Sequence, residues 1–508
     1  MTETTQKIPR RPWFNGDIFE QVIILIMTLV VIQTAVVTYW FSLADDSQGD
    51  SGRDAQILAI QGLGSRTAGS IRTGYDQSGA YQRWLELNTQ ATLAEQNDDP
   101  LAAERYLAAR DQVAQLSPML QPPYFNAEED IYPDVAGYEV DTYLLESITL
   151  TEKFANQYNL KSAWFDKANT HLVHITILAV ALFLFGLSTT AKTKISRMVF
   201  AGVGVALSLF VLVWMLLVYS QPVKGLSDEA ITAYARGVGL AYRGDNQQAI
   251  QSFDEALKLE PQYINAAKER ALAQLSLGDL QAAATGFEQA IGLGDRSADT
   301  YANLGWTYYL LGRFDFAIDA SRKALAVTPD ETWVRGTVAL SLLVSGRVDE
   351  STQEYDAIIR QAADLVSQAR SAGKQPPATL WWALDSSAAD LDDLLTCLDG
   401  TYCAGSYSAA DVRDPEKVRQ AADSLRIQLK QVSVALENSG VLPGVKPAVT
   451  IGAFNFTQEL PADGVNLEDL PQDTEFPISD APLYVLFSQE GLQAGQEAVV
   501  KVQFNGEE

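Results

Sequence analysis

The amino-acid sequence predicts a mainly α-helical protein with three transmembrane helices, an extracytoplasmic helical bundle, an α-solenoid and a small C-terminal β segment. Three observations carry this prediction. Three apolar stretches are each long enough, with their flanks, to cross a bilayer, which takes about 20 helical residues. Residues 227–360 repeat a pattern every 34 positions. After about Pro447, helical periodicity gives way to short stretches of alternating apolar and polar residues.

The three apolar stretches cover residues 22–41, 171–191 and 198–219, and none of them contains Asp, Glu, Lys or Arg. The second has a shorter apolar core, 172–187, and reaches the required length with its flanking residues. A buried core helix is the alternative for each stretch, and a cleaved signal peptide is a further alternative for the first. The length of the first favours a retained anchor. The lack of charge argues against a transporter or channel, whose paths usually carry charged side chains.

Charges beside these stretches predict their orientation, because short cytoplasmic segments are enriched in Lys and Arg. The N-terminal segment 1–21 and the turn 192–197 hold the basic residues Lys7, Arg10, Arg11, Lys192, Lys194 and Arg197. Acidic residues follow the first and third stretches, namely Asp45, Asp46, Asp50, Asp228 and Glu229. We therefore expect a multi-pass protein of the cell (plasma or inner) membrane. Its N-terminus and turn would be cytoplasmic, and 42–170 and the chain after 220 would be extracytoplasmic.

The composition argues against several classes of function. The chain has 508 residues, with 64 acidic and 37 basic side chains and a net charge of −27, which disfavours binding of nucleic acid. The sequence contains no Gly-x-Ser-x-Gly elbow, no His-Glu-x-x-His, no phosphate loop and no dinucleotide-binding fingerprint. We therefore expect no enzymatic activity, no catalytic residues and no cofactor.

The two histidines of the chain, His171 and His174, stand three residues apart where the second apolar stretch begins. They would share one side of a helix and could bind a metal together with Glu146 or Glu152. The favoured interpretation is a pair of interfacial imidazoles that hydrogen-bond to lipid headgroups or neighbouring helices. We therefore expect no metal site.

Residues 42–170 carry several helical patterns around a proline-containing middle, which predicts an antiparallel helical bundle next to the membrane. We expect the last pattern, 138–169, to continue without a break into the second apolar stretch. The region from about 50 to 220 resembles a family of uncharacterised bacterial membrane proteins, through Tyr81–Trp84, Ala103–Tyr106 and the pair of apolar stretches that follows. That resemblance implies no activity.

The repeat region, residues 227–360, shows columns of similar residues 34 positions apart. One column holds Gly244, Gly278, Gly312 and Gly346, and the column five positions later holds Ala249, Ala283, Ala317 and Ser351. Period and residue types resemble the tetratricopeptide repeat, most closely in Tyr301–Pro329. The resemblance implies four repeats of two helices each, in which the Gly ends the first helix in a left-handed conformation.

By the same resemblance, a concave face lined by the first helix of each repeat binds extended or helical segments of other proteins. That face would hold Tyr234, Lys268, Leu272, Trp306, Tyr309, Trp333 and Leu340. Some repeat proteins clamp a C-terminal carboxylate with Lys, Asn and Arg in this groove, and Asn265, Lys268 and Leu272 do not reproduce that pattern. The alternative is that the protein's own downstream helices cover the face.

The C-terminal third divides into a helical extension, 361–440, and a β-rich module, 447–508. In the extension, Cys397 and Cys403 flank an Asp-Gly turn, which allows a disulfide in an oxidising compartment. Free buried thiols are the alternative. In the module we expect strands at 449–457, 483–488 and 498–504, so that the chain either stops early in a β-sandwich or packs its sheet on the helices.

The predicted function is therefore a membrane-anchored scaffold that binds partner proteins through its repeats, in the assembly or organisation of an envelope complex. A sensor, in which the 42–170 bundle detects a ligand and relays it through the transmembrane helices, is the alternative. The lipid bilayer is the second expected partner, and homo- or hetero-oligomers can form through the transmembrane helices.

Overall fold

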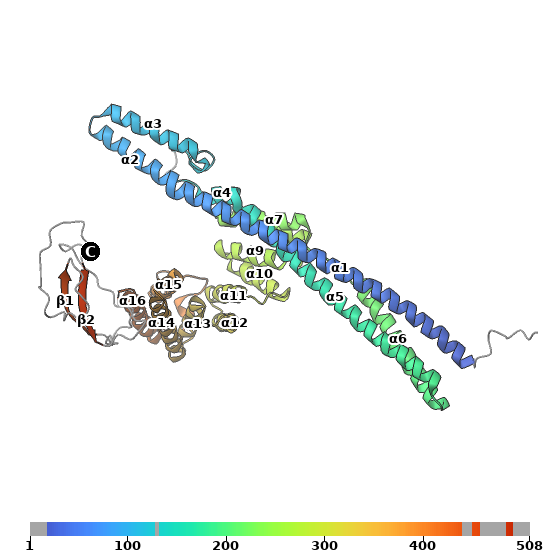
Figure 1. The fold of residues 1–508 in the computed structure, drawn as a ribbon. Helices are drawn as coiled ribbons and strands as arrows, with labels where there is room; N and C mark the ends of the chain where they lie inside the picture. The colour runs from blue at the N-terminus through green and yellow to red at the C-terminus, as the bar shows by residue number, and fades with distance from the viewer. Residues whose placement is uncertain (1–17, 128–131, 439–449, 458–483, 491–508) are drawn as a thin grey trace, which may run out of the picture. The chain divides into compact units, whose positions relative to one another are not determined.

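A computed structural model describes residues 18–127, 132–438, 450–457 and 484–490 (Figure 1). The chain divides into two compact units, residues 1–266 and 267–508. Lys7, Arg10, Arg11 and the predicted strand 498–504 lie outside the described residues.

Three long helices dominate the first unit. The helices α1 (Ile18–Tyr75) and α5 (Leu145–Thr190) run side by side, and α6 (Lys194–Ser220) packs against both (Figure 1). Each helix contains a stretch that is long and apolar enough to cross a membrane. The buried residues of α1 recur every seven positions, at Ile23, Val30, Val37, Ala44 and Ser51, which is the spacing of a coiled-coil contact.

The helix α1 continues beyond its apolar stretch. One unbroken helix covers the apolar stretch and the helical pattern over 54–71 that follows it. The contact stripe also continues, because Ala55, Gly62 and Gly69 are buried at the same seven-residue interval. Gly62 faces Leu150 of α5, and Gly69 faces Tyr143 just before α5. The predicted continuation of 138–169 into the second apolar stretch is confirmed, because helical structure runs without a break from Val135 to Thr190.

The far end of the first unit is a helical hairpin of α2 (Gln82–Gln96) and α3 (Pro100–Leu116). Asp99 caps α3 by accepting a 3.0 Å hydrogen bond from the Ala102 amide, as its position before Pro100 predicts. The π-helical turn η1 (Asp76–Tyr81) joins α1 to α2, and η2 (Pro118–Leu120), α4 (Val135–Glu139) and the π-helical turn η3 (Val140–Leu144) lead back to α5.

The repeat region forms eight consecutive helices. They are α7 (Asp228–Tyr242), α8 (Asn246–Leu259), α9 (Ile264–Ser276), α10 (Leu280–Gly292), α11 (Ala298–Leu310), α12 (Phe314–Val327), α13 (Thr332–Val344) and α14 (Val348–Ser371). The boundary between the two units falls within α9. Gly244, Gly278, Gly312 and Gly346 follow α7, α9, α11 and α13 with φ of 83°, 77°, 73° and 77°. The prediction that each Gly ends a helix in the left-handed region is therefore confirmed.

Two further helices complete the second unit, α15 (Ala378–Leu398) and α16 (Pro415–Asn438). The loop between them contains the short 3₁₀ turn η4 (Ala409–Asp411). Cys397 and Cys403 lie at disulfide distance across the start of this loop, with Cα atoms 4.4 Å apart. The strands β1 (Thr450–Thr457) and β2 (Tyr484–Glu490) pair antiparallel. The rest of the predicted β-rich module lies outside the described residues and stays a prediction.

Candidate partner-binding face and the anchor of the repeats

Three of the seven residues predicted for the concave face are buried. In the first unit, the ring of Tyr234 packs between Phe253 and Tyr263, with centroids 5.9 and 5.1 Å away. In the second unit, Tyr309 and Leu340 are each 1% exposed and belong to one hydrophobic core with α15 and α16. A partner on the surface therefore has no access to these three side chains.

The loop after α15 covers the ends of two repeat helices in the second unit. The Ser406 amide donates a 2.6 Å hydrogen bond to the carbonyl oxygen of Leu310, and the Arg413 amide donates one of 3.0 Å to that of Val344. These carbonyls belong to the last turns of α11 and α13, where helices leave acceptors unpaired. The Tyr407 and Tyr309 hydroxyl oxygens lie 2.7 Å apart. At these positions, then, the protein's own downstream segments cover the predicted face.

The other four predicted residues, Lys268, Leu272, Trp306 and Trp333, are half-buried. Trp306 stacks on Tyr309 with ring centroids 5.2 Å apart, so a buried neighbour holds its ring in place. Lys268 lies 3.7 Å from a carboxylate oxygen of Glu269. Against the effect of burial, hydrogen bonds from Thr300 and Ser297 lower the pKa of nearby Asp295, and the charge of Lys268 adds a smaller contribution. These four half-buried side chains, three apolar or aromatic and one lysine, are the predicted face residues that keep part of their surface exposed.

The first repeat is joined to α5 by a group of polar side chains that periodicity did not identify. Glu152, only 8% exposed, accepts a 2.9 Å hydrogen bond from the Tyr263 hydroxyl and bonds of 3.0 and 3.1 Å from the Asn265 amide. Burial and the Glu152 carboxylate raise the pKa of Tyr263, so its hydroxyl keeps its proton and donates. A buried carboxylate is stable only with such partners.

Further contacts extend this attachment along α5. Lys153 pairs with Asp228 at 2.8 Å. The Asn156 amide group bonds both backbone groups of Leu226, accepting at 2.8 Å and donating at 3.2 Å. We call Glu139, Glu152, Lys153 and Asn156 the repeat-docking surface. The hydroxyl of Tyr242 donates to the carboxylate of Glu139, and this bond, with burial, raises the pKa of Tyr242 to about 12.

One feature of the sequence could have pointed to this surface. Glu152 is the one charged side chain among the buried residues of α5. An acid at a position of the helical pattern that packs on other helices is a sign of a specific polar contact. Its partners, Tyr263 and Asn265, stand at the junction between two repeats, more than a hundred residues later. No periodicity relates such distant positions, so only the packing of α7 on α5 brings them together.

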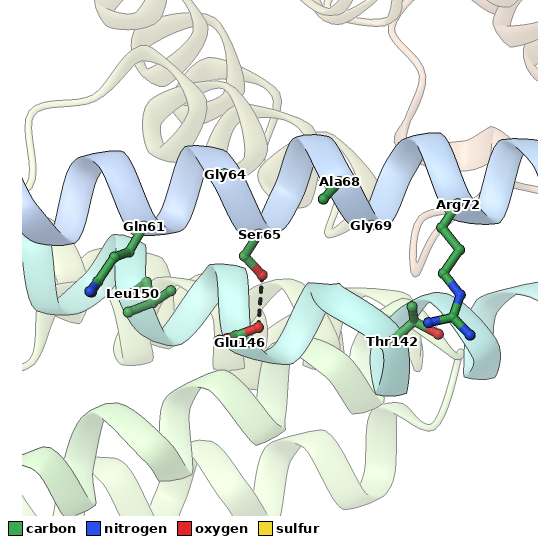
Figure 2. Close-up of a pocket in the computed structure, with 9 residues that line it drawn as sticks. All are labelled: Gln61, Gly64, Ser65, Ala68, Gly69, Arg72, Thr142, Glu146 and Leu150. Atoms are coloured by element: carbon green, nitrogen blue, oxygen red, sulfur yellow. Dashed lines mark hydrogen bonds between the residues drawn. The ribbon is translucent and has the colours of Figure 1, made fainter.

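A groove of about 650 Å³ with mixed polar and apolar lining lies between α1 and α5, farther along the same helix pair (Figure 2). Gln61, Ser65 and Arg72 from α1 line it, and Thr142 from η3 and Glu146 from α5 face them. Ser65 donates a 2.8 Å hydrogen bond to Glu146 across the groove. Small residues of α1, Gly64, Ala68 and Gly69, leave the space open.

His171 and His174 are both buried where α5 meets α1 and α6. The His171 ring lies 6.0 Å from that of Trp40, and the His174 ring packs edge-on against Trp214 at 4.6 Å. Glu146 and Glu152, the carboxylates considered as fellow metal ligands, bond to other groups. Within the described ranges, no three His, Cys, Asp or Glu residues gather as a metal site would need. The imidazoles thus pack against aromatic rings of neighbouring helices.

The repeat region is similar to known repeat proteins. A model of the tetratricopeptide repeat matches residues 298–331. The photosystem I assembly protein Ycf3 of Prochlorococcus marinus (strain NATL1A) is 25% identical over 139 residues, which cover 23% of this chain and 80% of Ycf3. Ycf3 of Synechococcus sp. (strain CC9605) is 28% identical over 157 residues, covering 30% and 73%.

Solved structures of repeat proteins are similar at low identity. YrrB, described as a TPR protein with an unusual peptide-binding site, shares 15% identity at a TM-score of 0.27, covering 41% of this chain and 91% of YrrB. MamA from Desulfovibrio magneticus RS-1 shares 19% at a TM-score of 0.25, covering 36% and 94%. The matched repeat model and the recurring glycine geometry agree, and residues 298–331 of this chain form a tetratricopeptide repeat.

Proposed function

We propose that this chain is a membrane-anchored scaffold whose repeats bind partner proteins on the extracytoplasmic side, in the assembly or organisation of an envelope complex. Tetratricopeptide repeats bind other proteins, which supports the scaffold role. Three long apolar helices support the anchor. The basic residues beside the turn between α5 and α6 support the orientation. Ycf3 is named for assembling photosystem I, a likeness that favours an assembly role here.

The observation that carries this proposal is the attachment of the first repeat to α5. The helix that holds Glu152 also contains the second apolar stretch, without a break between them. At 1.5 Å per residue, the 19 positions from Glu152 to His171 span roughly 28 Å. A repeat fixed at that height would stand clear of the bilayer and stay in a constant orientation to it. A scaffold needs such a fixed geometry to align partners with a membrane complex.

The open strip of Lys268, Leu272, Trp306 and Trp333 is the proposed binding face. Its apolar and aromatic character suits the apolar side of a helix or an extended segment. Large aromatic side chains with supported rings are typical binding hot spots, and Trp306 has that support from Tyr309.

The test is crosslinking in intact cells with a photoreactive amino acid at position 306, compared with the same probe at Asp319. Asp319 is exposed on α12, a second helix of its repeat, and so lies away from the concave face. We expect discrete adducts from 306 that Trp333→Ala weakens, and none of them from 319. Equal adducts from both positions would count against the binding face. A reporter fused after 225 that is active only in the cytoplasm would overturn the orientation.

The groove of Figure 2 favours a second candidate function, a sensor. A ligand between α1 and α5 would act on two helices that continue into apolar stretches. Cysteines at Ser65 and Glu146, whose side chains are hydrogen-bonded across the groove, report on its width. Crosslinking yields that change with the growth medium would support the sensor, and constant yields under all media would count against it.

A further inference from the structure

A second pocket lies where α5 and α6 leave their apolar stretches. It has a volume of about 430 Å³ and is lined by Asp166, Lys167 and Thr170 of α5 and by Gln221 and Lys224 after α6. The apolar stretch of α6 ends at residue 219 and that of α5 begins at 171, so the pocket sits at the end of both. If these stretches fill the hydrocarbon layer, the pocket lies among the lipid headgroups.

We propose that this pocket binds the headgroup of an amine-bearing phospholipid of the phosphoethanolamine type, with the phosphate on Lys167 and Lys224 and the amine beside Asp166. The inference rests on the proposed membrane anchor. It adds a specific lipid ligand that holds the α5–α6 junction.

Lys167 is positioned to bind an anion. Its side chain is half-buried, and its ammonium lies 5.5 Å from the centroid of the Trp164 ring. It donates one hydrogen bond, of 2.9 Å, to the Gln221 carbonyl oxygen, so two of its three protons remain for another acceptor. Among the residues that the structure describes, no carboxylate forms an ion pair with it. Burial removes water from the ammonium and so lowers the pKa of Lys167. A phosphate oxygen would replace that water and stabilise the charged form.

The other two charged groups determine which headgroup fits. The Lys224 side chain is 72% exposed, and its ammonium lies 3.2 Å from a carboxylate oxygen of Glu260. An ammonium has three N–H donors, so this contact leaves donors for a ligand in the pocket. Asp166 adds a carboxylate to the same rim. The lining of the pocket therefore holds two lysines and one carboxylate, while Glu260, the partner of Lys224, lies outside the lining. This set matches a phosphate that carries an ammonium with N–H donors. A choline headgroup has no N–H donor for Asp166, and a glycerol headgroup has no positive charge for it.

The experiment measures lipid retained by the full-length chain purified in mild detergent, by native mass spectrometry after adding phosphatidylethanolamine, phosphatidylglycerol or phosphatidylcholine in turn. Inorganic phosphate alone is a separate arm, because free phosphate shares the same chemistry. The variants are the double change Lys167→Gln/Lys224→Gln, Asp166→Asn, and Lys258→Gln as a control at an exposed lysine on α8.

We expect the unmodified chain to retain phosphatidylethanolamine best and the double variant to lose it by at least about tenfold, since two charge-assisted contacts are removed. Asp166→Asn should abolish the preference over phosphatidylglycerol, and Lys258→Gln should change nothing. Equal retention of all three lipids, unchanged binding by the double variant, or binding of inorganic phosphate without lipid would each overturn the assignment. Heat-denaturation curves recorded without lipid show whether each variant folds.

Extraction of cell membranes with alkaline carbonate separates this inference from the anchor on which it rests. A chain that stays in the membrane but does not retain phosphatidylethanolamine overturns the lipid site alone. A chain released by carbonate overturns both the anchor and the lipid site.

Discussion

The hydroxyl of Tyr263 donates a 2.9 Å hydrogen bond to the carboxylate of Glu152, a residue 111 positions earlier in the chain. This bond links the junction between the first two repeats to the long helix α5. The first repeat is therefore attached to α5 through a few buried polar contacts. Removing one partner of such a contact by a single substitution is expected to destabilise the attachment.

Replacing Glu152 by Ala should loosen the first repeat. The change leaves the hydroxyl of Tyr263 and the amide of Asn265 without their acceptor, and each buried unpaired group costs about 1–3 kcal/mol. Hydrogen–deuterium exchange of α7 and α8 should rise severalfold. Glu255→Ala is the control, because its ion pair with Arg236 is exposed on both sides. Equal exchange in the two variants would contradict the role of Glu152.

Adding a methyl group at Gly69 should separate α1 from α5. A Cβ atom there would overlap the side chain of Tyr143, and overpacking a close helix contact costs about 1–3 kcal/mol. The melting temperature of Gly69→Ala should therefore fall. Gly64→Ala is the matched control in the same helix, because a Cβ atom there meets nothing within 4 Å. It should be neutral or slightly stabilising, since Ala favours a helix over Gly. Equal effects would show that the helices do not approach as described.

The pH dependence of the second unit should reflect Asp390. Burial and the neighbouring Asp393 raise the pKa of Asp390 to about 7, and the hydroxyls of Tyr309, Tyr355 and Tyr407 are also close enough to feel its charge. Because the folded-state pKa exceeds the unfolded value of 3.8, the protonated group stabilises the fold, and this contribution is lost as pH rises from about 4 to about 7.

Asp390→Asn should remove that loss and stabilise the second unit above pH 7, by an amount on the order of 2 kcal/mol. Pulse proteolysis of the full-length chain at pH 5 and pH 8 measures it. Asp364→Asn, at an exposed position on α14, is the control. A difference between Asp390→Asn and the unmodified chain that stays the same at both pH values would refute the assignment.

The pair Cys397 and Cys403 should be oxidised in intact cells if the second unit is extracytoplasmic. Thiol alkylation before and after reduction measures this directly. Replacing both by Ser should destabilise the loop after α15 by about 2 kcal/mol, from the chain entropy of a small closed ring. Proteolysis near Tyr407 should then become faster. Free thiols in untreated cells would place the unit in a reducing compartment instead.

Features that depend on local spacing could be predicted from the amino-acid sequence. The 34-residue column of Gly244, Gly278, Gly312 and Gly346 predicted four helix ends, and all four residues have positive φ. The length and composition of the apolar stretches predicted helices long enough to cross a membrane, and α1, α5 and α6 contain them. Both signals have local causes: a Gly takes up the left-handed conformation that ends a helix, and about 20 consecutive apolar residues form a helix as long as the hydrocarbon layer is thick.

Which surfaces remain open depends on the packing of segments that are distant in the sequence. Tyr309 and Leu340 occupy the register of a binding face, yet α15, α16 and the loop carrying Tyr407 bury them. From the sequence, Glu152 was considered only as a possible metal ligand. The packing of α7 on α5 instead gives it two hydrogen-bond partners, Tyr263 and Asn265. Local periodicity indicates which side of a helix is apolar. The segments that pack on that side lie tens to hundreds of residues away in the sequence, so periodicity does not identify them.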